Sequence, residues 1–279
     1  MFYLLIILLT SGMFAAAFRV GSLAFRRLLR VPTRKPIQRP VPVPWPAIIN
    51  RIPVVSQLTP TERQKLLAIV QDLVDTRSWQ GCGGLELTEE TQVLIAAQAG
   101  VLVLGHNGDP YPGVETILVY PSTFRPRRFS WTPSSDEVET SPALGEAWHH
   151  GVVILAWDSV KSGAENPFDG RNVTFHEFAH QLDGDAGAFD GVPLLGERSA
   201  YTAWAAVLDL EFERLTEAAE KGEPSVLDYY GATDRSEFFA VATEAFFEKP
   251  QQLKEKHAEL YARMAQFYRQ DPAAWPSAR

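Results

Sequence analysis

The sequence predicts an α+β fold in which several packed helices cover a small mixed sheet. Segments with the apolar spacing of helices occupy most of the chain. Only residues 116–120 and 152–157 are short runs of β-branched and apolar residues typical of strands. These two runs lie together near the middle of the chain, with helical segments before and after them. Strands and helices that are segregated in this way are typical of the α+β class.

The composition is that of a globular protein with an uneven charge distribution. Of 279 residues, 46% are hydrophobic and 22% are charged, which is ordinary for a globular domain. Eight of the 26 Lys and Arg residues lie within residues 1–60, where Asp and Glu are absent, so all 34 acidic residues follow. The acidic remainder lacks the positive face that phosphate binding needs. The charge therefore argues against nucleic acid as the main partner.

Residues 1–30 are predicted to form a single-pass membrane anchor. The first 18 residues carry no charge, and a helix that spans a bilayer needs about 20 apolar residues. The arginines that follow are Arg19, Arg26, Arg27 and Arg30. Because positive charge favours the cytoplasmic side, the rest of the chain is expected in the cytoplasm. The alternatives are a signal cleaved near residues 15–17 or a peripheral amphipathic helix.

Residues 31–54 are predicted to be a spacer between this anchor and the main domain, residues 55–279. The prolines of this segment are Pro32, Pro36, Pro40, Pro42, Pro44, Pro46 and Pro53. Proline removes backbone donors and favours the extended polyproline conformation. The segment is therefore expected to be extended and semi-rigid.

The main domain is expected to begin with a helix over 59–79, which Thr59 caps and in which Pro60 occupies the first turn. A tight turn at 80–84 and a buried helix over 88–104 follow. The later elements are, in chain order, the strand 116–120, a loop over 121–150, the strand 152–157, a helix around 176–180, a Gly- and Asp-rich loop over 183–191, and helices over 199–221, 236–247 and 251–269.

A metal-binding pattern lies on the helix around 176–180, whose sequence is His-Glu-Phe-Ala-His. His176 and His180 are four residues apart, so both imidazoles lie on one helix face and can bind one Zn2+ ion. Glu177 follows the first histidine and is placed to take a proton from a metal-bound water. The motif also occurs by chance on ordinary helices. Here the apolar flanks predict a buried helix, where these polar groups need partners. The pattern thus favours a zinc-dependent hydrolase.

The third metal ligand is not given by the motif. A metzincin would carry histidine six residues after His180, but position 186 is alanine. Glu197 and Glu237 are candidates, and Glu244 lies two turns after Glu237 on the same expected helix face. Cys82, the single cysteine, lies in a Gly-rich turn. In a deformylase-like amide hydrolase it would serve as the third ligand. Because the chain has only this one cysteine, an intramolecular disulfide is excluded.

Other polar residues near these segments have open roles. Asp183 and Asp185 are candidates to orient the imidazoles, although loop solvation also accounts for them. His149 and His150 precede the strand 152–157, which is expected to bind an extended peptide by β-addition. His106 is expected in a turn.

Four segments of the chain resemble the Mlc titration factor A family of zinc peptidases. They are HEFAHQLD at 176–183, YYGATDRSEFFAV at 229–241, GCGGLELTEETQVLIAAQA at 81–99 and GEAWHHGVVILAWDSV at 145–160. The resemblance covers residues 55–272. The apolar start and the proline-rich segment depart from the family pattern.

The resemblance implies a zincin-like metallopeptidase similar to the catalytic core of anthrax lethal factor. It implies that Zn2+ is held by His176, His180 and Glu237, that Glu177 is the general base and that Tyr230 stabilises the oxyanion. It implies aminopeptidase activity on a peptide or protein, and a transcriptional regulator as a partner. The alternative is a regulator-binding protein in which peptidase activity is secondary.

Overall fold

The computed structural model describes residues 39–122, 151–185, 189–195 and 198–276. Its helices and strands are α2 (Trp45–Ile49), α3 (Pro53–Ser56), α4 (Pro60–Thr76), β1 (Ser78–Gly81), α5 (Glu89–Leu102), β2 (Thr116–Tyr120), β3 (Val152–Ala156), α7 (Trp157–Glu165), α8 (Val173–Gly184), α9 (Arg198–Lys221), η1 (Tyr229–Ala232), α10 (Arg235–Glu248), α11 (Pro250–Lys256), α12 (Ala258–Tyr268) and η2 (Pro272–Ala274). The predicted combination of many helices with a small sheet is confirmed.

The sheet differs from the prediction, because its described strands are all parallel and not mixed. The strand order is β1-β2-β3. Ser78 pairs with Thr116, and Thr116 in turn pairs with Val152. Parallel neighbours need a crossover connection, and α5 lies in the connection from β1 to β2. The buried side chains alternate along β2 and, up to Leu155, along β3, which is the period expected of strands.

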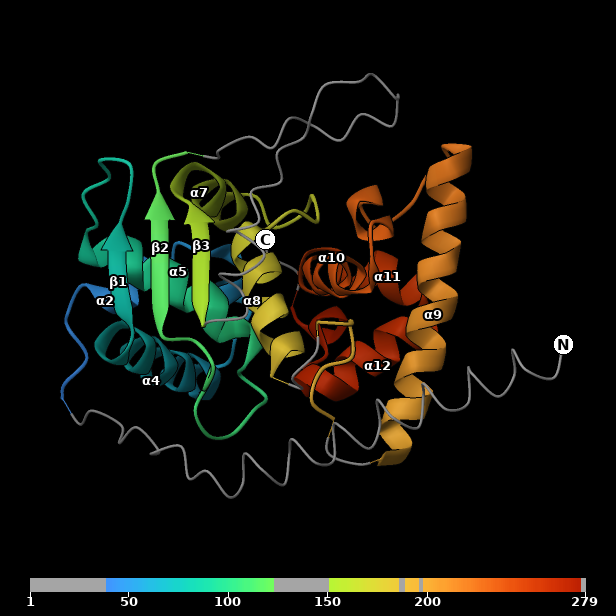
Figure 1. Ribbon diagram of the computed structural model, residues 1–279. Helices are drawn as coiled ribbons and strands as arrows, with labels where there is room; N and C mark the ends of the chain where they lie inside the picture. The colour runs from blue at the N-terminus through green and yellow to red at the C-terminus, as the bar shows by residue number, and fades with distance from the viewer. Residues whose placement is uncertain (1–38, 123–150, 186–188, 196–197, 277–279) are drawn as a thin grey trace, which may run out of the picture.

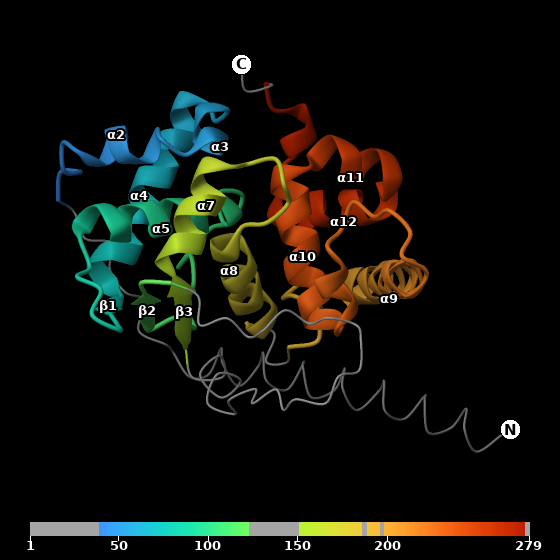
Figure 2. The same cartoon turned by 90° about the horizontal axis from the view of Figure 1, so that it is seen from above.

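Helix α8 lies in the centre of the molecule. Figures 1 and 2 show it between the sheet and the C-terminal helices α9 to α12. It packs against β3 and α5 on one side and against α10 on the other. Every residue of α10 from Glu237 to Glu248 is buried. The two helices that meet in the core are therefore the ones that carry the predicted ligands.

The local signals of several helices are confirmed. Thr59 and Glu62 form a capping box at the start of α4, with the Thr59 N–H donating to Glu62 Oε2 at 2.8 Å. Helix α5 is buried nearly all round, as its apolar sequence predicts. The prediction of a single helix over 251–269 is wrong. The non-helical backbone of His257 (φ −135°, ψ 56°) separates α11 from α12.

The extended conformation predicted for the spacer is wrong for the described residues 39–54. Pro46 and Pro53 lie in the first turns of the short helices α2 and α3, where proline is tolerated. Trp45 and Ile49 are buried, and α2 packs against α5. The anchor expected over 1–30 lies outside the described residues. Among the residues that are described, no helix has the length and apolarity to cross a bilayer.

Replacing Trp45 by alanine is expected to destabilise the whole domain. The side chain is 0% exposed, and loss of a buried Trp costs about 3–5 kcal/mol of unfolding free energy. Val43, two residues earlier, is 92% exposed, so Val43→Ala should change that energy by less than about 0.5 kcal/mol. Urea denaturation of both variants measures the difference. Equal stability of the two variants would mean that residues 39–54 are a spacer after all.

Candidate metal centre

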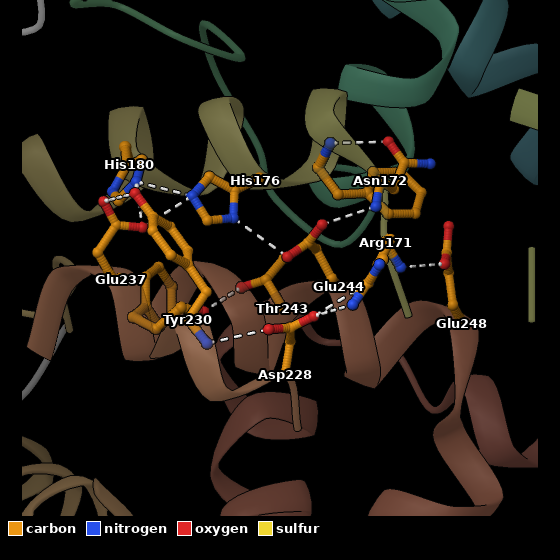
Figure 3. A network of polar contacts seen from close by, with 12 residues as sticks. Arg171, Asn172, His176, His180, Asp228, Tyr230, Glu237, Thr243, Glu244 and Glu248 are labelled. Carbon is orange, nitrogen blue, oxygen red and sulfur yellow. Dashed lines mark hydrogen bonds and ion pairs between the residues drawn. The ribbon is translucent and has the colours of Figure 1, made fainter. Parts of the chain in front are cut away.

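Two histidines of α8 and one glutamate of α10 bring their ligand atoms together. One ligand atom from each of His176, His180 and Glu237 lies within 4.8 Å of the others. The two Nε2 atoms are 3.3 Å apart, and Glu237 Oε2 is 2.9 Å from His176 Nε2 and 3.6 Å from His180 Nε2. Figure 3 shows these groups facing one another between the two helices. Among the described residues, this is the cluster of side chains that can hold a metal ion.

The caps of the two helices place these side chains. Asn172 caps α8 by accepting a hydrogen bond from the Phe175 N–H at 3.0 Å. Asp234 caps α10 by accepting from the Glu237 N–H at 2.9 Å. Glu237 therefore stands in the first turn of α10, where the positive end of the helix dipole favours a carboxylate.

Glu244 contacts the nitrogen of His176 that faces away from Glu237 and His180. Its Oε2 lies 3.1 Å from His176 Nδ1, and its Oε1 accepts from the Asn172 N–H at 2.6 Å. A carboxylate acceptor requires a proton on His176 Nδ1, so Nε2, which faces Glu237 and His180, is the nitrogen left to bind a metal ion. Glu244, which the sequence placed on the same helix face as Glu237, is thus a partner of His176.

The charges of the cluster suit a cation. Burial would raise the pKa of Glu237, but hydrogen bonds from His176 and His180 outweigh it, and the pKa lies far below its usual range. Burial would lower the pKa of His176, but Glu244 and Glu237 outweigh it and raise the pKa well above its ordinary value. A metal ion at this place would therefore displace a proton from His176.

Glu177 is half-buried on the same helix. Burial raises the pKa of this carboxyl, and the nearby imidazoles of His176 and His180 act against the shift. A carboxylate whose pKa is moved toward neutral pH can both accept and release a proton under ordinary conditions.

Tyr230 approaches the cluster from the short helix η1. Its N–H is held by Asp228 Oδ1 at 2.9 Å, and its hydroxyl donates to Glu237 Oε1 at 3.2 Å. The ring lies 5.8 Å from the ring of His176. Burial and the charge of Glu237 raise the pKa of the Tyr230 phenol, so it stays protonated as a donor.

A cavity of about 490 Å³ opens beside His176. Tyr230, Glu244 and the Arg171–Asp228 ion pair line it, together with residues of α7. This volume lies within the range of small-ligand sites. Figure 3 shows Arg171 and Asp228 paired next to Glu244.

Some candidates lie elsewhere or outside the described residues. Cys82 follows β1 and contacts Tyr120, and it is not part of the ligand cluster. His106 packs against Phe267, with ring centroids 5.2 Å apart. The remaining candidates, Glu197, His149 and His150, lie outside the described residues.

Asp183 reaches His180 through a residue that the sequence did not indicate. The Ser236 hydroxyl lies 3.0 Å from His180 Nδ1 and donates to Asp183 Oδ2 at 3.0 Å. Ser236 directly precedes Glu237, but no sequence signal places it against α8, because that contact depends on how the two helices dock. Asp185, the other candidate, is the C-cap residue of α8.

Comparison with known proteins finds relatives that match most of the chain. The chain is 44% identical over 239 residues to uncharacterized protein slr2042 of Synechocystis sp.. The aligned region covers 84% of this chain and 86% of that protein. The chain is 32% identical to Mlc titration factor A of Pectobacterium atrosepticum over 82% of this chain and 87% of that protein. Mlc titration factor A of Serratia proteamaculans is 31% identical over 80% of this chain and 86% of that protein.

A model of the family described as glucose-regulated metallo-peptidase M90 matches residues 29–269. The match begins just before the end of the expected anchor and includes α8, η1 and α10. The chain therefore belongs to the glucose-regulated metallo-peptidase M90 family.

Proposed function

We propose that this protein is a zinc-dependent peptidase that uses His176, His180 and Glu237 as metal ligands. The observation that carries the proposal is the convergence of these three ligand atoms within 4.8 Å. The orientation of His176 by Glu244 supports it, since metal-bound histidines almost always have such a partner behind them. Membership of a metallo-peptidase family supports hydrolysis of peptide bonds as the reaction.

The donor set fits zinc. Two imidazole nitrogens and one carboxylate oxygen are the ligands of catalytic zinc sites that keep a fourth position open. When bound, zinc supplies a Lewis acid and lowers the pKa of a bound water toward about 7. His176 and His180 would hold it from α8, and Glu237 from α10.

Glu177 is proposed as the general base. Its carboxylate takes a proton from the attacking water and gives it to the amine that leaves. Burial raises its pKa, which favours the second step at neutral pH. The Tyr230 hydroxyl, beside Glu237 Oε1, is proposed to donate to the oxyanion of the scissile carbonyl.

Replacing Tyr230 by phenylalanine is expected to lower kcat by about 10²–10³-fold, the usual cost of losing one oxyanion donor. KM and zinc content should change little, because the hydroxyl is not proposed as a ligand. Tyr229→Phe is the matched control, since the Tyr229 hydroxyl bonds to the backbone carbonyl of Glu223 and not to the cluster. Steady-state kinetics on chromogenic peptides measure both variants. An unchanged kcat for Tyr230→Phe would remove this residue from the mechanism.

The finer specificity is proposed to be that of an aminopeptidase, as the family resemblance implies. A panel of aminoacyl chromogenic substrates tests it, with each substrate in a free and an N-acetylated form. Cleavage of the free forms alone supports the proposal. Equal cleavage of both forms would indicate an endopeptidase, and zinc content without any cleavage would indicate that the metal has another role.

A second candidate function is binding of a transcriptional regulator. The observation that favours it is the name Mlc titration factor A, carried by relatives 28–32% identical to this chain. Comparing capture of such a regulator by the wild type and by an inactive variant separates binding from cleavage. The membrane anchor over 1–30 and the cytoplasmic position of the main domain stay predictions from the sequence.

A further inference from the structure

We infer that Ser236 is a positioning residue for His180, and that it fixes which nitrogen of this imidazole faces the metal. Asp183 accepts a hydrogen bond from Ser236 and is itself held by the backbone N–H of Gly191. The inference rests on the proposed metal centre and concerns how tightly that centre binds its ion.

The direction of the hydrogen bonds determines the tautomer of His180. Asp183 Oδ2 accepts from the Gly191 N–H at 2.9 Å and from the Ser236 hydroxyl at 3.0 Å. A serine hydroxyl has one proton, so Ser236 has none left for His180. Its oxygen must therefore accept the hydrogen bond, and His180 must carry its proton on Nδ1. Nε2, which lies 3.3 Å from His176 Nε2 and 3.6 Å from Glu237 Oε2, is then the nitrogen that can bind a metal ion.

Burial makes this arrangement strict. His180 and Asp183 are both fully buried, so water replaces a lost partner poorly there. The opposite tautomer would place two hydrogen-bond acceptors face to face between His180 and Ser236. A buried polar group without a partner is unfavourable, so the network selects the tautomer that binds a metal.

The far end of the network is fixed by close backbone packing. Gly191 has φ +75°, and a Cβ there would lie 2.3 Å from the Arg235 carbonyl oxygen. Only glycine lets its N–H reach Asp183 while the chain passes this close to the start of α10. The Gly191 carbonyl accepts from Trp204 Nε1 at 2.9 Å. The network therefore joins His180 on α8 to α9 and to the first turn of α10.

The first turn of α10 thus has two roles in the metal centre. It supplies the ligand Glu237 and, one residue earlier, the hydroxyl that orients the ligand His180. The two histidines are held differently: a carboxylate faces Nδ1 of His176, whereas a neutral hydroxyl faces Nδ1 of His180.

Ser236→Ala in the full chain tests the inference. We expect its zinc affinity, measured by competition with a chromophoric chelator, to fall about 10–100-fold, the usual effect of removing the partner of a metal-bound histidine. Ser236→Thr keeps the hydroxyl and should restore the wild-type affinity. Ser56→Ala is the matched control, because that hydroxyl bonds to the Pro53 carbonyl in α3, away from the cluster.

A second measurement reports the tautomer directly. In the metal-free wild type, the ¹⁵N chemical shifts of labelled histidine should show the His180 proton on Nδ1, and in Ser236→Ala a mixture of tautomers. If Ser236→Ala does not fold, Asp183→Asn takes its place, with an expected loss of zinc affinity of about 10-fold or more.

Wild-type zinc affinity in the folded Ser236→Ala variant, or in Asp183→Asn if that replaces it, would overturn the inference and leave the proposed function intact. A wild-type protein that binds no zinc would instead overturn the proposed function itself.

Discussion

Replacing Glu177 by glutamine is expected to abolish peptide hydrolysis and leave the metal in place. Glutamine has nearly the same shape but takes up no proton, so the attacking water loses its base. General-base catalysis contributes about 10²–10⁴-fold, and kcat should fall by at least the lower figure. Zinc content should stay at the wild-type level, because the three expected ligands, His176, His180 and Glu237, are unchanged.

The control for this variant is Glu255→Gln, an exposed glutamate on α11 that removes the same charge far from the cluster. Metal analysis and single-turnover kinetics are measured on both proteins. Wild-type cleavage by Glu177→Gln would show that another group activates the water.

Replacing Glu237 by alanine is expected to remove the metal. The variant loses one of three ligands, and His176 Nε2 and the Tyr230 hydroxyl lose an acceptor at the same time. We expect zinc affinity to fall by more than about 100-fold. That figure is the largest loss usual when a residue hydrogen-bonded to a ligand is replaced, and here a ligand itself is removed. Hydrolysis should be lost with the zinc.

Zinc stoichiometry after dialysis measures this effect. The control is Glu220→Ala, which replaces an exposed residue of α9. Stoichiometric zinc in Glu237→Ala would move the third ligand to Glu197, which lies outside the described residues. A Glu197→Ala variant would then test that assignment.

Helix α8, with both histidines on one face, could be predicted from sequence because its signals are local. The spacing of His176 and His180 fixes their common face, and the apolar flanks indicate a buried helix. The capping signals at Thr59 and Thr88 are local as well, and the starts of α4 and α5 follow them. Each of these predictions depends on interactions between residues three or four positions apart.

The errors arise where distant parts of the chain decide the structure. Strand β1 has the sequence Ser-Trp-Gln-Gly, which lacks β-branched residues, and its pairing with β2 makes it a strand. Helix α7 begins at Trp157, directly after β3, and has no side-chain cap that would indicate its start. The prolines before residue 54 indicate extended chain, yet burial of Trp45 and Ile49 against the core forms α2 instead.

The same limit applies to the site. Glu237 could be assigned only through the family resemblance, because spacing alone left Glu197 and Cys82 open. The roles of Ser236 and Glu244 depend on the docking of α10 against α8, to which no local pattern points.

The metal centre is divided between two helices, and this has a consequence for biosynthesis. Glu237 lies 61 residues after His176, and the whole of α9 is made between them. A chain that emerges from the ribosome therefore carries the two histidines long before it carries the third ligand. The loop between them must close against its entropy before any ion is held by all three. Capture of a metal ion by all three proposed ligands would thus be a late event in the synthesis of the chain.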